Sequence, residues 1–277
     1  MTNVAAMSDP EINGHRLHVE RRGEGDPLLL IMGLSGNTAH WGDPFVELLE
    51  RDFEVIAYDH RGTGRSAPVS APFTITDLAD DAAGLLDTLE LDRVAVLGIS
   101  MGGMVAQELA LAHPGRVATL ILGCTYAGGE GSTFTDQATI ERLAEPVMSG
   151  DRERATRAGW EVNVSKTYAA ERAHWEAFRR MVLERPTTLS VIMQQLQAIT
   201  DHDTSHRLPE LKVPTLVVHG TEDEMLPVAN ARAIAEAIPD ARLEIFEGVG
   251  HLFFWEQPER TAELVRDFVR TGQTARP

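Results

Sequence analysis

The sequence has very little cysteine and lacks any hydrophobic run long enough to cross a bilayer. Cys124 is the single cysteine in 277 residues, so it cannot form an internal disulfide, and the fold does not depend on an oxidising compartment. The longest apolar run, LLLIMGL, is far too short for a transmembrane helix, and the N-terminal stretch has no apolar signal region. We therefore expect a cytoplasmic protein with no membrane partner.

The sequence also lacks an excess of positive charge. It has 25 Lys and Arg against 42 Asp and Glu, a formal net charge of -17, which would repel nucleic acid and anionic membrane surfaces. It contains no internal repeat, low-complexity tract or interdomain linker. Its 43% hydrophobic and 24% charged residues are ordinary for a globular protein with a sizeable core. This composition excludes nucleic acid as a partner and leaves monomer and homodimer open.

Six apolar runs of strand length recur along the chain. They are PLLLIMG from Pro27, FEVIAYD from Phe53, RVAVLG from Arg93, VATLILGC from Val117, PTLVVHG from Pro214 and ARLEIFEG from Ala241. Continuous apolar runs are typical of strands buried on both faces of a parallel sheet. The opening segment INGHRLHVERRGEGDP instead alternates polar and apolar residues and contains turn residues, which predicts an antiparallel hairpin at the sheet edge.

Amphipathic segments of helical length separate most of these runs. They are DPFVELLE, TDLADDAAGLLDTLE, SMGGMVAQELALAH, VANARAIAEAIP and PERTAELVRDFVR. This alternation predicts an α/β fold with a mostly parallel, doubly wound central sheet and helices on both faces. From residue 125 to residue 207 the strand-like runs stop while helical patterns continue. We therefore predict a core of residues 1–124 and 208–277 and a helical cap insertion of residues 125–207.

Three glycines surround Ser100 in the stretch VAVLGISMGGMVAQELALAHP. A sharp turn from strand to helix explains them, because Gly98 and Gly102 would let the two backbones approach each other. Such a turn projects the serine hydroxyl above the edge of the sheet. The G-x-S-x-G pattern in this setting predicts a nucleophilic serine, the alternative being an ordinary glycine-rich turn.

A serine hydroxyl is a weak nucleophile until a base takes its proton and a third group orients that base. Loops that follow later strands of a parallel sheet meet at one edge, so we expect the partners there. The segment TEDEMLP after one such run offers Glu222, Asp223 and Glu224, and VGHLFFW after the next offers His251. The order serine, acid, histidine is that of one known serine-hydrolase architecture.

Four segments of the chain resemble signatures of a known family and occur in the order that the family has. They are YDHRGTGRSA, GISMGG, VPTLVVHGTEDEMLP and IFEGVGHLFFWEQPE. Over nearly its whole length the chain resembles serine-nucleophile enzymes of the α/β-hydrolase fold, among them enol-lactone hydrolases and small esterases. The segment LLIMGLSGN is similar to polyketide methyl esterases. The family pattern G-x-x-D implies Asp223 as the triad acid and His251 as the base, with Glu222 and Glu224 as solvated neighbours.

The resemblance implies a hydrolase that cleaves a small-molecule carboxylic ester or lactone through an acyl-enzyme on a Ser100–His251–Asp223 triad, without cofactor or metal. The negative oxygen that forms on attack needs backbone N–H donors. Met101, which follows the nucleophile, should supply one donor, and Leu34, in the loop LIMGLSGNTAHW, should supply the other.

Other residues have a functional and a structural interpretation. Met32 stands where the family commonly has a histidine, and a backbone donor tolerates this change. Trp41 is a candidate substrate-binding residue, the alternative being a core aromatic. The motif DHRGTGRS and the thiol of Cys124 are interpreted as structural. The cluster DHDTSH at residues 201–206 has carboxylates and imidazoles, but nothing else completes a metal-ligand set.

Several rival functions use the same scaffold. Dehalogenases and epoxide hydrolases resemble it but have an aspartate as nucleophile, which Ser100 argues against. Carbon–carbon bond hydrolases keep the serine triad, and cofactor-free haloperoxidases act by perhydrolysis on the same acyl-enzyme. A rival of another class is a slow-turnover small-molecule receptor, since some plant hormone receptors and a bacterial stress regulator look like α/β-hydrolases.

Overall fold

The main sheet contains seven strands within residues 9–274, which are the residues that the computed structural model describes. The strands are β3 (Val19–Arg22), β4 (Asp26–Ile31), β5 (Phe53–Tyr58), β6 (Val94–Ile99), β7 (Val117–Gly123), β8 (Thr215–Gly220) and β9 (Arg242–Phe246). They lie in the order β3-β5-β4-β6-β7-β8-β9, and β3 alone among them is antiparallel to its neighbour. The predicted mostly parallel sheet is confirmed. Residues 1–8, which belong to the N-terminal stretch considered above for a signal region, lie outside the described residues.

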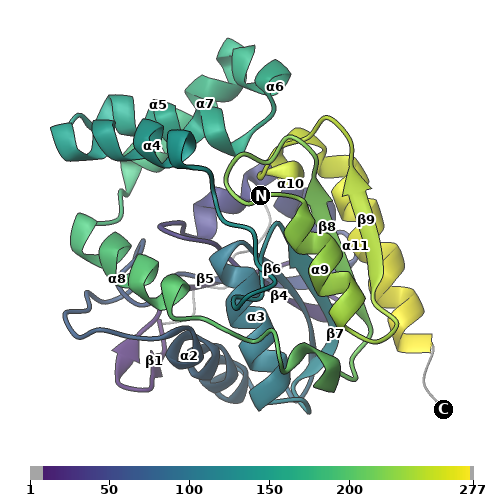
Figure 1. Ribbon diagram of the computed structural model, residues 1–277. Helices are drawn as coiled ribbons and strands as arrows, with labels where there is room; N and C mark the ends of the chain where they lie inside the picture. Colours follow the sequence, from purple (N-terminus) through teal and green to yellow (C-terminus); the bar gives the residue numbers. More distant parts are fainter. Residues whose placement is uncertain (1–8, 275–277) are drawn as a thin grey trace.

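The apolar runs are continuous because both faces of the sheet are covered. On β4, Leu28 and Leu30 face one core, Leu29 and Ile31 face the other, and all four are fully buried. Helices α2 (Ile75–Thr88), α3 (Met101–Ala112) and α9 (Ala229–Ala237) cover one face. Helices α1 (Asp43–Leu49), α10 (Phe253–Glu256) and α11 (Pro258–Thr274) belong to the other (Figure 1). This is the doubly wound arrangement that the alternation predicted.

The N-terminal hairpin differs from the prediction. Strands β1 (Glu11–Ile12) and β2 (His15–Arg16) pair in a separate two-stranded sheet, and β3 then joins the main sheet beside β5. Asn13 and Gly14 form the tight turn between β1 and β2, both with positive φ, as two-residue hairpin turns require. The alternating segment therefore contains a small hairpin and the antiparallel edge strand, instead of one hairpin in the main sheet.

The strand order reverses at β4, which lies between β5 and β6. The chain leaves β4 towards β5 and later returns to the other side of β4 as β6. Where the strand order reverses in this way, a crevice opens at the carboxyl ends of the strands. The loop from Met32 follows β4, and Ser100 follows β6, so both lie at this point.

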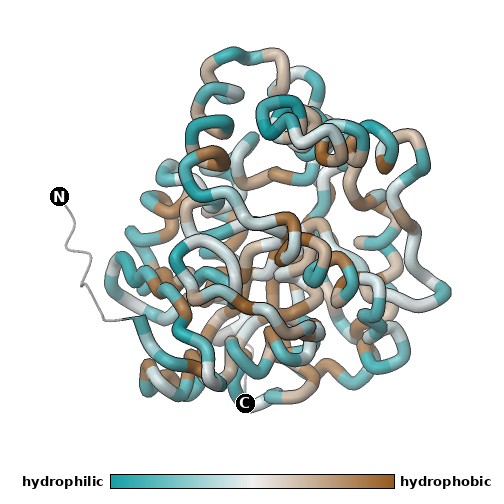
Figure 2. The backbone as a smooth tube through the Cα atoms, turned by 90° about the vertical axis from the view of Figure 1, so that its left-hand side faces the viewer, coloured by the Kyte–Doolittle hydropathy of each residue, from teal (hydrophilic) through white to brown (hydrophobic). Residues whose placement is uncertain are grey.

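Five helices fill the segment between β7 and β8, all of whose residues are described. They are α4 (Gln137–Ser149), α5 (Arg152–Asn163), α6 (Lys166–Ala170), α7 (Arg172–Glu184) and α8 (Leu189–Thr200), and we call them the cap helices. The two short 3-10 helices η1 (Thr38–Trp41) and η2 (Leu208–Glu210) lie outside this group. Figure 1 shows α4, α5, α6 and α7 above the sheet and α8 lower down, and in Figure 2 most of the hydrophobic trace lies in the lower part of the molecule. No helix among the described residues is long and apolar enough to cross a membrane.

Candidate active site

Ser100 occupies a strained turn between β6 and α3. Its φ of 56° and ψ of -122° lie outside the regions that ordinary residues favour. Hydrogen bonds hold the turn: the Ser100 N–H donates to the carbonyl oxygen of Gly123 at 2.9 Å, and the Thr125 hydroxyl donates to the carbonyl oxygen of Ser100 at 2.7 Å. A non-glycine residue kept in this conformation is typical of a functional site.

Close backbone contacts around Ser100 leave no room for a side chain at the neighbouring glycines. A Cβ on Gly98 would lie 2.3 Å from the carbonyl oxygen of Gly102, and a Cβ on Gly102 would lie 2.0 Å from that of Ile31. These distances are far below contact distance, and backbone atoms cannot move aside cheaply. Gly33 of the neighbouring loop also lies against the serine, since its Cβ would be 3.0 Å from that of Ser100. The tight turn thus brings the serine and the loop after β4 together.

His251 and Asp223 are in direct contact. Asp223 follows β8 and His251 follows β9, and His251 Nδ1 lies 2.7 Å from Asp223 Oδ2. The other carboxylate oxygen, Oδ1, accepts hydrogen bonds from the N–H groups of Met225 and Leu226, both at 2.8 Å. Burial alone would raise the pKa of Asp223, but the charge of His251 and the hydrogen bonds from His219 and His251 outweigh it and hold that pKa below its usual range. Asp223 is therefore ionised.

Ser100 lies at the same sheet edge as this pair, but no hydrogen bond joins its Oγ to His251 within residues 9–274. Hydrogen bonds between a nucleophile and its base are often long in a protein without substrate and shorten in the complex. The structure thus brings two of the three predicted residues into contact and places the third at the end of β6, a strand of the same sheet.

The two predicted oxyanion donors are both free. Neither the Met101 N–H nor the Leu34 N–H donates to a protein group in the described part of the chain. The next N–H in the loop, that of Ser35, is already used, because it donates to Oε1 of Gln195 on α8 at 2.8 Å. Of these two neighbouring amides of the loop, that of Leu34 is therefore the one available to a ligand.

The motif DHRGTGRS supports the loop after β4. One carboxylate oxygen of Asp59 accepts a hydrogen bond from the Thr38 N–H at 2.7 Å, and His60 Nε2 donates to the carbonyl oxygen of Met32 at 2.9 Å. Burial lowers the pKa of His60, so the ring is neutral and Nε2 carries its proton. These contacts fit the structural interpretation of the motif.

Trp41 is fully buried among Phe45, Phe254 and other residues of the core on the α1 side of the sheet. Its ring centroid lies 5.0 Å from that of Phe254. A side chain without exposed surface contacts a ligand only after repacking, so the packing favours the core alternative over the predicted substrate contact.

Three polar residues at the site were missed by sequence reasoning: His219, Gln195 and Glu256. His219 contacts Asp223, Gln195 contacts the loop after β4, and Glu256 accepts hydrogen bonds from the N–H groups of Gly250 and Ser165 at 2.8 Å each. His219 and Glu256 lie in the segments VPTLVVHGTEDEMLP and IFEGVGHLFFWEQPE, which mark the region but not the role of either residue. Gln195 lies in no motif, and its contact joins residues far apart in the chain.

Cys124, His219 and Asp223 form a buried cluster whose potential metal-ligand atoms lie within 4.8 Å of one another. His219 Nε2 lies 2.8 Å from the carbonyl oxygen of Leu226, so this nitrogen carries a proton and has no lone pair for a metal. Burial and the neighbouring carboxylate raise the pKa of the Cys124 thiol, which stays protonated. The cluster is a hydrogen-bonded group, and its donor set as arranged does not fit a cation.

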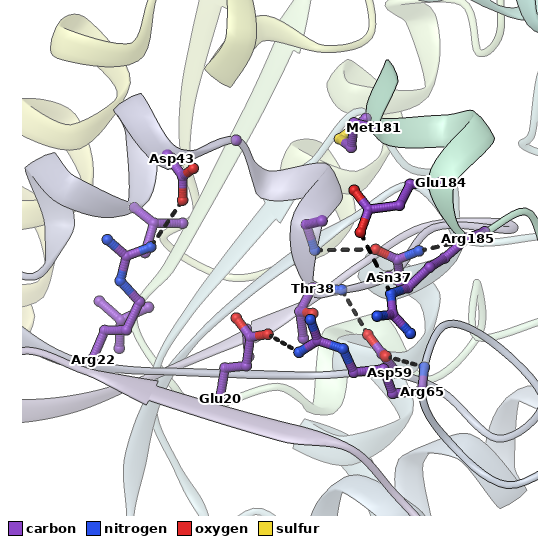
Figure 3. Close-up of a pocket in the computed structure, with 15 residues that line it drawn as sticks. Glu20, Arg22, Asn37, Thr38, Asp43, Asp59, Arg65, Met181, Glu184 and Arg185 are labelled. Carbon is purple, nitrogen blue, oxygen red and sulfur yellow. Dashed lines mark hydrogen bonds and ion pairs between the residues drawn. The ribbon is translucent and has the colours of Figure 1, made fainter. Parts of the chain in front are cut away.

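A cavity of about 230 Å³ lies away from these residues, lined by parts of β3, η1, α1 and α7 (Figure 3). Its charged side chains are largely paired with each other, as Arg65 is with Glu20 and Arg22 is with Asp43. None of the predicted catalytic residues lines it. This cavity is therefore separate from the site built around Ser100.

The chain resembles known hydrolases along most of its length. The family model described as alpha/beta hydrolase fold matches residues 26–258. A protein of Azorhizobium caulinodans named "Putative carbamate hydrolase RutD" is 31% identical, covering 91% of this chain and 94% of its own. A thermophilic esterase from Thermogutta terrifontis has a TM-score of 0.80 at 29% identity, covering 98% of both chains. The enol-lactonase from Burkholderia xenovorans LB400 has a TM-score of 0.82 at 28% identity, covering 94% of this chain and 99% of its own.

Proposed function

The chain belongs to the α/β-hydrolase fold family and is a hydrolase of that family, and from this premise we propose that it cleaves a carboxylic ester or lactone with a Ser100–His251–Asp223 triad. The observation that carries the proposal is the strained turn at Ser100, which is followed by the free N–H of Met101 and lies against Gly33, the residue before Leu34. The contact between His251 and an ionised Asp223 supports it further.

The proposed reaction has two halves. Ser100 Oγ attacks the carbonyl carbon while His251 Nε2 takes its proton, and Asp223 stabilises the imidazolium that results. The N–H groups of Met101 and Leu34 hold the negative oxygen. His251 then gives the proton to the leaving alkoxide as the carbon–oxygen bond breaks, which leaves the acyl-enzyme.

Water completes the reaction. His251 takes a proton from a water molecule as its oxygen attacks the acyl carbon, and the proton passes to Ser100 Oγ when the bond to the serine breaks. An open ester gives an acid and an alcohol. In a lactone the alcohol stays attached to the acyl group, so the single product is a hydroxy acid.

A carbamate is the second candidate substrate, because one relative is named as a carbamate hydrolase at 31% identity. Its carbonyl carbon is open to the same attack, and the same oxyanion donors would serve. The nitrogen lone pair of a carbamate makes its carbonyl less reactive than that of an ester. The hydrolysis rates of an ester and a carbamate with the same leaving group therefore show which of the two substrate classes the enzyme prefers.

The test is hydrolysis of p-nitrophenyl esters from acetyl to decanoyl, of an enol lactone and of a p-nitrophenyl carbamate, with a chelator present. We expect the parent to hydrolyse esters or the lactone faster than the carbamate, and Ser100→Ala to lose about 10⁴-fold or more. Equal rates for parent and variant would refute the nucleophile. Turnover near zero with tight ligand binding would favour a receptor, and preference for the carbamate would replace the ester assignment.

A further inference from the structure

We propose that His219 is a positioning residue for the triad acid and tunes the base, an inference that rests on the proposed function. Its Nε2 lies 3.0 Å from Asp223 Oδ2, the oxygen that His251 also contacts. The carboxylate of Asp223 thus lies between two imidazoles that share one of its oxygens.

The position of His219 fixes its hydrogen-bonding role. The side chain belongs to β8 and is fully buried, and its Nε2 lies 3.0 Å from Asp223 Oδ2 and 2.8 Å from the carbonyl oxygen of Leu226. Its Nδ1 is buried and has no hydrogen-bond partner among the described residues. A proton there would be a buried donor without an acceptor, which is costly, so the single ring proton lies on Nε2.

Four donors surround the carboxylate of Asp223. Oδ1 accepts hydrogen bonds from the N–H groups of Met225 and Leu226, Oδ2 contacts His251 Nδ1 at 2.7 Å, and the Nε2–H of His219, shared with the carbonyl oxygen of Leu226, lies 3.0 Å from Oδ2. Donors on both oxygens fix the orientation of the carboxylate, and with it the ring of His251. Loss of the His219 ring would leave Oδ2 in contact with His251 alone and would leave the carbonyl oxygen of Leu226 without its partner.

The shared oxygen also affects the basicity of His251. A hydrogen bond from His219 draws negative charge from Oδ2, so less of that charge stabilises the imidazolium of His251. With His219 in place, His251 therefore stays neutral and able to accept a proton at a lower pH than it would if Asp223 Oδ2 contacted His251 alone. The pH at which the nucleophile becomes active reports this effect.

Other titratable groups near the pair do not supply it. The Cys124 thiol faces Asp223 from the end of β7 and stays protonated, since burial and that carboxylate raise its pKa. Glu256 lies on α10 and its pKa is raised, chiefly by burial, with Glu222 adding to the effect. Among the described residues, no Lys or Arg forms an ion pair with Asp223, and the two histidines are the only rings in contact with its carboxylate.

The test uses a fluorophosphonate probe, which needs no knowledge of the natural substrate. Ser100 Oγ attacks phosphorus, the phosphorus–fluorine bond breaks, and fluoride leaves while His251 takes the proton. The labelling rate is measured between about pH 5 and pH 9, a window that spans the titration of a histidine base. Parent, His219→Phe and His219→Gln are compared, with Ser100→Ala as the blank.

We expect His219→Phe to label about 10-fold more slowly and its midpoint pH to rise by about half a unit or more, because Oδ2 then interacts with His251 alone. His219→Gln, whose amide N–H can take the place of Nε2–H, should recover most of the rate and the parent midpoint. His202→Phe is the matched control, because it removes another buried histidine that contacts no triad residue. The midpoint pH of its labelling rate should equal that of the parent.

Two results would overturn the inference. A midpoint in His219→Phe that equals or lies below that of the parent would mean that His219 only packs. So would a His219→Gln variant as impaired as the Phe variant although both melt like the parent. If His219→Phe does not fold, His219→Asn replaces it, since its shorter amide cannot reach Asp223. A parent that is not labelled at Ser100 refutes the proposed function itself, whereas labelling without any effect of His219 refutes this inference alone.

Discussion

At the scale of single residues, buried imidazoles link the stability of the protein to pH. His202 is 6% exposed, and burial lowers its pKa from 6.5 to about 4. In the unfolded chain the ring regains its ordinary pKa, so between these two values the unfolded state binds more protons than the folded state. This contribution to stability is complete above pH 6.5 and is lost as the pH falls towards 4.

We therefore predict that His202→Gln loses less stability in acid than the parent. The difference in unfolding free energy between about pH 7 and pH 5 should be smaller in the variant by about 2 kcal/mol. His206→Gln, at an exposed position of the same loop, is the control and should behave like the parent. Urea unfolding at both pH values measures the effect, and equal losses in parent and His202→Gln would contradict it.

The residue scale is also where the sequence was most informative. Ser100, Asp223 and His251 stood out because strain, charge and spacing leave a pattern in the chain, and their local structure agrees with that pattern. Trp41 left no such pattern, since an aromatic after a loop can line a pocket or fill a core with the same sequence signal. Its burial became apparent only once α10 and α11 were placed beside it.

At the scale of elements, the cap helix α8 holds the loop after β4. Gln195 accepts a hydrogen bond from the Ser35 N–H at 2.8 Å, and Thr187, just before the helix, donates to the Ser35 carbonyl oxygen at 2.7 Å. Ser35 has a positive φ of 60°, a conformation that needs support in a residue with a side chain. The cap thus contributes to the position of the neighbouring Leu34 amide.

Gln195→Leu should therefore lower kcat by about 10-fold while KM changes little, because a displaced oxyanion donor weakens transition-state binding. Gln197→Leu changes the same residue type on the exposed face of α8 and should leave both constants near those of the parent. The measurement is the kcat and KM of the parent and both variants on the ester that the parent hydrolyses fastest. A change confined to KM would instead mean that Gln195 contacts the substrate and does not position the loop.

The boundaries of most elements follow from the sequence, but their contacts across the chain do not. The run PLLLIMG predicts a strand, and β4 spans Asp26–Ile31. Ser35 and Gln195 are 160 residues apart, and no periodicity in either segment indicates that they meet. The short helix α10 was not predicted, because a segment of four residues carries no helical period, and the division of the predicted helical stretch into α5, α6 and α7 was not predicted either.

At the scale of the whole molecule, one hydrophobic cluster joins the cap to the segment after β9 that contains His251. Trp160 and Phe178 of the cap pack with Leu252, which follows His251, and with Trp255 of α10. The Leu252 N–H also donates to the carbonyl oxygen of Asn163 at 2.8 Å. The sheet positions the strands that carry the site, while the cap contacts two of the loops that complete it.

The layered sheet was predictable, since it depends on strand length and alternation. Which cap residues contact the body was not, because Trp160 and Phe178 have the same helical spacing as any core residue. The substrate preference depends on such contacts, which is why the reaction type is better defined than the substrate.

The most direct test of the central claim is to find where an organophosphate becomes attached. Parent, Ser100→Ala and His251→Ala are treated with the same inhibitor, and the adduct is located by mass spectrometry of peptides. We predict one adduct on Ser100 in the parent, none in Ser100→Ala, and at least about 100-fold slower formation in His251→Ala, where the base is missing. An adduct on another residue, or one that forms on Ser100 equally fast without His251, would contradict the triad.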